Sequence, residues 1–126
     1  MEPEQYKQMS IHTVKIDIWI KPELLAQLFS NKFGIKGLSW LDSDESEHGE
    51  WSVLGVNPKE VITCTKDNNI KSNDNPFKKL QKIQHGFWMG WLSYEAGAWL
   101  EPQNDWHNNE IATLWIASYD PIIRIN

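Results

Sequence analysis

The sequence predicts a single α+β domain built on a mainly antiparallel sheet or sandwich of about seven strands, with two short helices. Three observations favour this class. Short runs alternate apolar and polar residues, turn residues separate these runs, and two other stretches have helical spacing. A chain of 126 residues with 40% hydrophobic and 23% charged residues has the size and composition of one ordinary globular domain.

The first strand is expected at residues 12–20, after a polar segment, residues 1–11, that we expect to be a flexible arm. Apolar and polar side chains alternate along this strand: Val14, Ile16 and Ile18 on one face, Thr13, Lys15 and Asp17 on the other. A period of two residues is typical of a strand with one buried face and one solvent-exposed face. The domain itself is therefore expected to span residues 12–126.

The first helix is expected at about residues 22–32. Pro22 suits the first helical position, and Gly34 stops the run. The apolar residues between them fall at helical spacing: Leu24, Leu25, Leu28 and Phe29. This spacing predicts that the helix covers a face of the sheet.

Further strands are expected at residues 37–41, 51–56, 59–66, 86–94, 111–119 and 121–125. We expect the last of these to be the antiparallel neighbour of the strand before it. The Asp-Asn-Asn sequence at residues 67–69 predicts a hairpin turn, with a short return strand from Ile70. Strand 86–94 contains Gly86 and Gly90, which predict that another backbone comes close there.

The second helix is expected to begin after Asn75, which suits the N-cap position, with Pro76 as the first helical residue. The apolar residues that follow lie on one face: Phe77, Leu80 and Ile83. Residues 94–101 are expected to make one further helical turn.

Charge and hydropathy restrict the classes of partner. With 12 Lys and Arg against 17 Asp and Glu, the formal net charge is −5. A nucleic-acid-binding surface needs clustered positive charge, so no nucleic-acid partner is expected. No apolar run approaches the ~20 residues needed to cross a bilayer, and the polar N-terminus lacks the apolar core of a signal peptide. We therefore expect a cytoplasmic protein without a membrane partner.

The residues that usually carry chemistry form no recognisable constellation. The four histidines have no metal-ligand spacing, and the single cysteine, Cys64, excludes an intrachain disulfide and any multi-cysteine zinc site. The sequence also lacks a Ser-centred elbow, a phosphate-binding loop and a dinucleotide fingerprint. We therefore predict no catalytic and no metal-binding residues, and a binding or scaffolding module rather than an enzyme.

Eight tryptophans are the unusual feature of the composition. They indicate a bulky core, an interface with another domain, or an aromatic platform for a ligand. Apolar and hydroxyl side chains converge at residues 40–43, 51–54 and 90–95, which would suit a small amphipathic ligand. The alternative is that the serines in these segments only cap turns and strand ends.

The same segments resemble sequence elements of a known protein family. Residues 40–43 (Trp-Leu-Asp-Ser) are similar to a Leu-Leu-(Glu/Asp/His)-Ser element, and residues 49–58 to a Gly-Arg-Tyr-Ser element that ends in Pro. Residues 86–97 resemble a glycine-punctuated element that ends in Tyr-(Asp/Glu), and residues 117–120 (Ala-Ser-Tyr-Asp) match the strand end that follows it. These elements, in this order, are typical of the N-terminal domain of component I of anthranilate synthase and of para-aminobenzoate (aminodeoxychorismate) synthase.

The resemblance covers about residues 12–126 and implies a non-catalytic domain of the component I fold. In this family the chorismate and magnesium site lies in a C-terminal catalytic domain, to which no segment of this chain corresponds. The resemblance therefore implies that Mg²⁺ binds only in that domain and that this chain alone is inactive. The implied partners are the catalytic domain, covalent or separate, and a glutamine amidotransferase that supplies ammonia.

The resemblance also implies half of a tryptophan pocket. The matching positions are Ser43, Trp51, Ser52, Val53 and Leu54. The sequence departs from the family at Glu50, where Arg is usual, at Trp51, where Tyr is usual, and at Trp40, where Leu or Phe is usual. These departures weaken the prediction of tryptophan binding but not that of the fold.

Several alternatives stay open. The Leu-Asp-Ser and Leu-Ser-Tyr-Glu sequences are closer to the aminobenzoate branch, and the alternative is the regulatory domain of anthranilate synthase component I, with tryptophan feedback. A further alternative is a stand-alone module, derived from this family, that binds a small ligand or a protein. Asn126 is either a natural end or a cut within a longer protein. An uncovered aromatic face would also predict self-association.

Overall fold

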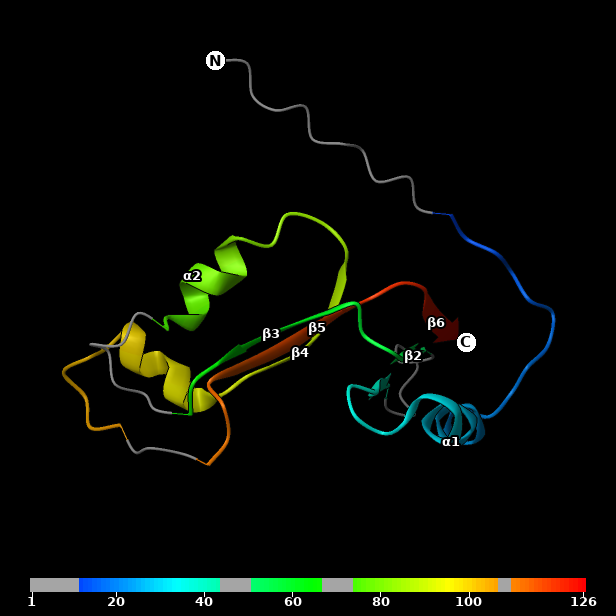
Figure 1. Cartoon of the computed structure of the whole chain (residues 1–126), viewed down its shortest axis with the longest axis horizontal. Helices are drawn as coiled ribbons and strands as arrows, with labels where there is room; N and C mark the ends of the chain where they lie inside the picture. The colour runs from blue at the N-terminus through cyan, green and yellow to red at the C-terminus, as the bar shows by residue number, and fades with distance from the viewer. Residues whose placement is uncertain (1–11, 44–50, 67–73, 107–109) are drawn as a thin grey trace, which may run out of the picture.

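The computed structural model describes residues 12–43, 51–66, 74–106 and 110–126 (Figure 1). In chain order the elements are α1 (Pro22–Phe33), β1 (Ser39–Asp42), β2 (Ser52–Gly55), β3 (Glu60–Cys64), α2 (Pro76–Gln81), β4 (Phe87–Leu92), the 3-10 helix η1 (Tyr94–Trp99), β5 (Leu114–Tyr119) and β6 (Ile122–Ile125). The expected arm, residues 1–11, and the expected turn and return strand at residues 67–70 lie outside the described residues.

The strands form two antiparallel sheets. The first sheet has the order β1-β2-β6 and the second the order β3-β5-β4. The α+β class is confirmed. The expected count of about seven strands was wrong for the described residues, in which each sheet has three strands.

The difference in count comes from residues 12–20, which belong to no strand of the described structure. Val14, Ile16 and Ile18 are 82%, 72% and 71% exposed, and Figure 1 shows this segment outside the sheets. Alternation fixes only which face a strand would bury. A strand also needs a neighbour for its backbone hydrogen bonds, and the alternation does not supply one.

The pairing expected for residues 121–125 was also wrong. These residues form β6, which pairs with β2 in the first sheet instead of with β5. Pro121, between β5 and β6, has no N–H to give to a ladder with β5, so the chain leaves the second sheet there. β6 then aligns Arg124 with Val53 and Ile123 with Leu54.

The two sheets pack closely through Gly55 of β2. A Cβ atom at this position would lie 2.5 Å from both Met89 Cε and Tyr119 Cγ. Tyr119 is 1% exposed, and its hydroxyl donates to the Gly37 carbonyl and lies 2.7 Å from Ser39 Oγ. One tyrosine therefore ties β5 to the start of β1.

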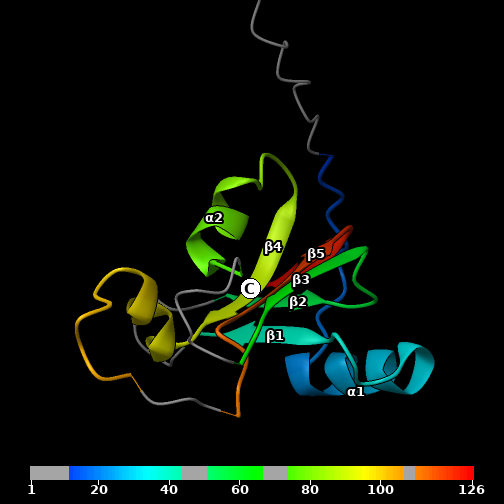
Figure 2. The ribbon, with the colours of Figure 1, turned by 60° about the vertical axis from the view of Figure 1, so that its left-hand side comes forward.

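The opposite face of the second sheet is covered by α2 (Figure 2). The core between them comprises Cys64, Leu114 and Ile116, with Ile62, Leu80, Ile83 and Trp88 packed against it. The predicted start of α2 is confirmed: the Asn75 side chain accepts from the Phe77 N–H at 3.0 Å, and Pro76 is the first helical residue.

α1 spans the predicted region but covers the sheet less than expected. Of its residues, all within the described part of the chain, only Ala26 is buried. Leu24 and Leu28 are half exposed to solvent, at 51% and 52%. Neither α1 nor any other helix in the described ranges is long and apolar enough to cross a membrane.

The close approach predicted at Gly90 is confirmed, because a Cβ there would clash with the backbone of Trp115 and Ile116 on β5. Gly86 serves a different purpose. Its φ of 99° lies in the region that favours glycine, and the nearest atom to a Cβ would be the side chain of Trp88. The sequence could identify the glycines but not which of the two reasons applied.

Candidate binding surfaces

Two of the segments singled out in the sequence lie on neighbouring strands. β1 and β2 are paired so that Asp42 lies opposite Ser52, Leu41 opposite Val53 and Trp40 opposite Leu54. Ser43 and Trp51 are the next residues along the two strands. All five predicted tryptophan-pocket residues (Ser43, Trp51, Ser52, Val53 and Leu54) are thus found at the paired part of β1 and β2 and its adjoining end.

Strand alternation divides the four predicted residues at 51–54 between the two faces of the first sheet. Ser52 and Leu54 are buried, at 6% and 0% exposure, and the Ser52 hydroxyl donates to the Asp42 carboxylate. Val53 belongs to the opposite face and packs against the core between the sheets. The side chains of Ser52 and Leu54 therefore lie on the opposite face of the first sheet from that of Val53.

Trp51 has a partner that sequence reasoning missed. The Arg124 guanidinium carbon lies 4.3 Å from the centroid of the Trp51 ring, a cation–π contact. Trp51 is 44% exposed and Arg124 is exposed, so this pair is accessible at the surface. The only signal in the sequence was the polar position of Arg124 within β6, which does not identify Trp51 as its partner.

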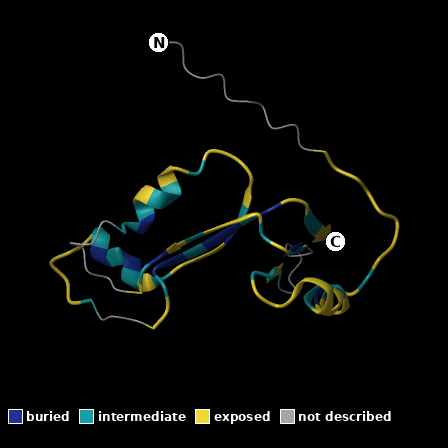
Figure 3. Cartoon of the chain, in the orientation of Figure 1, coloured by how far each residue is buried: buried dark blue, intermediate teal, exposed yellow. Residues whose placement is uncertain are grey.

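The third segment, residues 90–95, begins in the second sheet at the end of β4, whereas the other two belong to the first sheet. We name residues 91–100, from the end of β4 through η1, the β4–η1 segment. Its exposed apolar side chains are Trp91, Leu92, Tyr94 and Leu100. Figure 3 shows the mixture of exposed and buried residues in this part of the chain.

The β4–η1 segment also contains unpaired polar atoms. Ser93 Oγ and Trp99 Nε1 are buried and have no hydrogen-bond partner among the described residues. Ser93 precedes η1 but its side chain makes no cap bond to that helix. The alternative in which the Ser93 side chain caps the next element is therefore not found in the described structure. Buried polar atoms without partners are uncommon in folded proteins.

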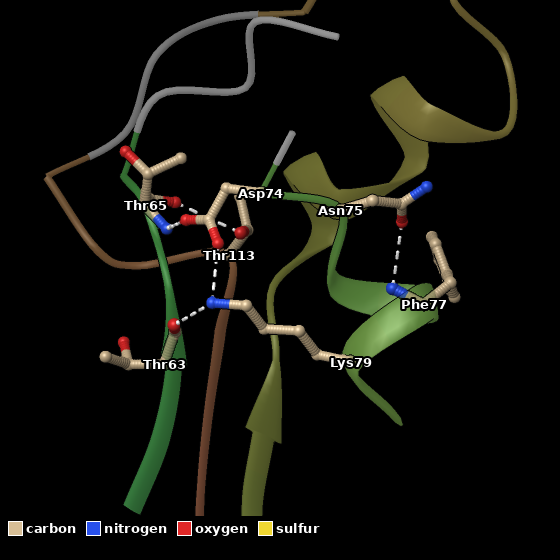
Figure 4. A network of polar contacts seen from close by, with 7 residues as sticks. All are labelled: Thr63, Thr65, Asp74, Asn75, Phe77, Lys79 and Thr113. Atoms are coloured by element: carbon tan, nitrogen blue, oxygen red, sulfur yellow. Dashed lines mark hydrogen bonds and ion pairs between the residues drawn. The ribbon is translucent and has the colours of Figure 1, made fainter. Parts of the chain in front are cut away.

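The most connected polar cluster lies at the start of α2 (Figure 4). Asp74 Oδ1 is 2.6 Å from Lys79 Nζ, and its other oxygen accepts from the Thr65 N–H. Lys79 Nζ also donates to the Thr63 carbonyl at 2.9 Å, and the Thr113 hydroxyl donates to the Thr65 carbonyl at 3.0 Å. These contacts fasten α2 to β3, so this cluster has a structural role.

The charged groups in this cluster shift each other's pKa. Burial pushes the pKa of the Asp74 carboxyl upward, but the Lys79 ammonium and the Thr65 N–H outweigh burial and hold this pKa below its usual value. The hydrogen bond to Asp74 raises the pKa of Lys79. Burial, followed by the nearby Asp74 charge, raises the pKa of the Cys64 thiol, which makes it a poor nucleophile.

No group of three or more His, Cys, Asp or Glu residues that could hold a metal ion is present in the described part of the chain. His48 and His107 lie outside it. The chain matches no protein family model, no curated protein and no solved structure.

Proposed function

We propose that this chain is a non-catalytic domain of a chorismate-using synthase component I of the aminodeoxychorismate type. It packs against the chorismate-binding catalytic half and contributes half of a tryptophan pocket. In this proposal Mg²⁺ and chorismate are bound by the catalytic half, and a glutamine amidotransferase supplies ammonia. The chain itself performs no chemical step.

The observation that carries the docking role is the β4–η1 segment. Trp91 is 40% exposed and Tyr94 is 84% exposed, while Ser93 Oγ and Trp99 Nε1 are buried without a partner among the described residues. Exposed aromatic side chains are typical of protein interfaces. An interface that covered this segment would bury the exposed rings of Trp91 and Tyr94.

The same face of the second sheet extends this surface. Val61 pairs with Ala117, and Ala117 with Met89, so these side chains share the face on which Phe87 and Trp91 lie. The first sheet packs on the middle of this face, yet Val61 and Phe87 remain 47% and 39% exposed. The part of the face not covered by the first sheet is therefore available to a partner.

The tryptophan half-pocket is proposed at the end of β1 and β2. By strand alternation, three of the predicted pocket residues belong to the same face of the first sheet: Ser43, Trp51 and Val53. The Trp51 ring, with Arg124 over it, is exposed there. Ser52 and Leu54 support these strands from the other face. In the complete enzyme the catalytic half provides the remaining contacts to the ligand.

The docking role is tested with the chain and the catalytic half encoded by the same organism. Light scattering after size-exclusion chromatography is expected to detect a complex of the two. We expect Trp91→Asp and Tyr94→Asp together to weaken this complex at least tenfold, because charges replace buried rings. The matched control is Ile35→Asp, an equally drastic change at a residue that is 79% exposed and outside the β4–η1 segment.

The same samples are assayed for aminodeoxychorismate formation from chorismate and ammonia. Activity that requires the chain, and that falls with the β4–η1 variant but not with Ile35→Asp, supports the proposal. A catalytic half that neither binds the chain nor gains activity from it would refute it. Formation of anthranilate instead would assign the chain to the other branch of the family.

Tryptophan binding is measured by calorimetry on the complex. We expect Trp51→Ala to reduce the affinity about tenfold or more, and Phe33→Ala, at the far end of α1, to leave it unchanged. Equal affinity for both variants would remove Trp51 from the pocket without affecting the docking role.

A further inference from the structure

The exposed segment at residues 14–18 and the edge of the first sheet suit each other. Among the described strands β6 lies at the edge of this sheet, with β2 on its other side. Such an edge presents unpaired backbone groups, which natural proteins usually cover. Residues 14–18 have the alternation of a strand but belong to no sheet in the described structure.

One hydrogen bond already joins the two elements. The Trp19 indole N–H donates to the Asn126 carbonyl at 3.2 Å, directly after the end of β6. If Trp19 stays beside Asn126, the residues before it can lie along β6 only in the same direction as β6. Counting back from this contact places Ile18 beside Ile125, Asp17 beside Arg124 and Ile16 beside Ile123.

The side chains independently favour the same register. Ile123 pairs with Leu54 and Ile125 with Ser52, so both point to the face on which Leu54 is buried. Ile16 and Ile18 would join this apolar face, and a slip of one residue would turn both of them away from it.

The opposite face is matched in charge. In this register Asp17 lies beside Arg124, which is exposed and carries no ion pair in the described structure. Among the described residues Asp17 has one weak partner, Lys15 Nζ at 3.9 Å, with both side chains about 90% exposed. Neighbouring strands stabilise each other through such opposite-charge pairs.

We propose that residues 14–18 add to the first sheet of the same chain as a strand parallel to β6. This strand covers the sheet edge and removes Ile16 and Ile18 from water. This strand does not depend on the chorismate enzyme or on the β4–η1 segment, so its test is independent of the docking role; only Arg124 is shared, because it also contacts the Trp51 ring.

Disulfide trapping tests the register. Asp17→Cys with Arg124→Cys is expected to form an intramolecular disulfide on mild oxidation, because neighbouring strands bring Cα atoms within bonding range. Native Cys64 is 2% exposed and will not compete. The matched control, Lys15→Cys with Arg124→Cys, is displaced by two residues, about 7 Å along the strand. We expect it to form at least tenfold less disulfide.

The products are separated by mass on a non-reducing gel. A cross-linked monomer for the first pair and little product for the control supports the proposal. Equal yields from both pairs would show an unstructured segment and overturn it. A cross-linked dimer would also overturn it, because the strand would then come from a second copy.

Hydrogen exchange gives a second readout without cysteines. We expect Asp17→Arg to speed exchange at the amides of residues 15–18 about two- to fivefold, the effect of one exposed ion pair. Asp17→Arg combined with Arg124→Asp should restore the slower rate. Fast exchange at these amides in the unmodified chain would contradict the proposal directly.

Discussion

The two α-helices are fastened to the molecule in different ways. α2 has only six residues, but Asn75 caps it, Asp74 and Lys79 tie it to β3, and Leu80 enters the core of the second sheet. α1 has twelve residues, and Ala26 is the one that it buries among its described residues. The shorter helix is therefore the more firmly held.

This difference teaches that anchoring depends on contacts rather than on helix length. Most helical stability in proteins comes from packing an apolar face, and α1 leaves about half of the surface of Leu24 and of Leu28 exposed to solvent. The N-terminal region, which includes the exposed residues 14–18, thus has apolar side chains whose burial is incomplete within the described structure. The second sheet and α2 enclose the more completely buried core.

The largest expected effect is in the core under α2. Leu114 is 1% exposed, and we expect Leu114→Ala to lower the free energy of unfolding by about 3 kcal/mol through lost burial and a cavity. Leu28→Ala on α1 should cost less than about 0.5 kcal/mol, because that side chain is already exposed. Urea denaturation measures both. Equal costs would remove the contrast between the helices.

A second prediction concerns the contact between the sheets. Gly55→Ala should destabilise the chain by about 2 kcal/mol, because the new Cβ would overlap Tyr119 and Met89. Gly34→Ala, where no atom lies within 4 Å of a Cβ, tests the effect of backbone conformation alone, since its φ is 86°. If Gly55→Ala is harmless in urea denaturation, the sheets do not pack as closely as described.

The ion pair beneath α2 predicts a dependence on pH. The folded-state pKa of Asp74 is lowered from 3.8, so its contribution is full above pH 3.8 and is lost as the pH falls through the lower, folded value. The pKa of Lys79 is raised from 10.5, so its contribution is full below pH 10.5 and is lost as the pH rises through the higher, folded value.

Asp74→Asn should therefore cost about 1 kcal/mol at pH 7, a value reduced by the partial exposure of both side chains. The difference from the unmodified chain should shrink in acid below about pH 4. Thermal unfolding across this pH range measures it, with Asp120→Asn on the exposed Lys59 pair as the control that should cost almost nothing. A constant difference at all pH values would argue against the ion pair.

The smallest predicted effect is a gain in α1. Lys21 stands at its N-cap position and makes no cap hydrogen bond to any described residue. Lys21→Asp should stabilise the chain by about 0.5 kcal/mol, because aspartate caps the first N–H groups and complements the helix dipole. A small rise in melting temperature is the readout. An unchanged melting temperature would indicate that the missing cap at the start of α1 does not limit the stability of the chain.

Local signals in the sequence predicted much of the fold. Asn75 and Pro76 identified the start of α2, and the expected strands at residues 37–41, 51–56, 59–66, 86–94, 111–119 and 121–125 overlap all six strands of the described structure. Pairing between distant strands was harder. Nothing local in Ile122–Ile125 specifies β2 as its neighbour, and the order of strands in a sheet depends on contacts that a linear pattern does not contain.

The candidate sites were predicted less completely for the same reason. Sequence identified Trp51 but not Arg124 over its ring, and it identified Ser52 but not the hydrogen bond from its hydroxyl to Asp42. The segment at residues 14–18 shows the opposite case. Its alternation predicted a strand, but these residues belong to no strand in the described structure, because alternation alone does not supply a neighbouring strand.

Hydrogen exchange of the chain with and without the catalytic half tests the central claim most directly. We expect at least tenfold slower exchange in residues 91–100 on mixing, and no change in α2, which is already covered and anchored. Unchanged exchange in residues 91–100, or slowing confined to α2, would contradict the proposal that the β4–η1 segment is the docking surface.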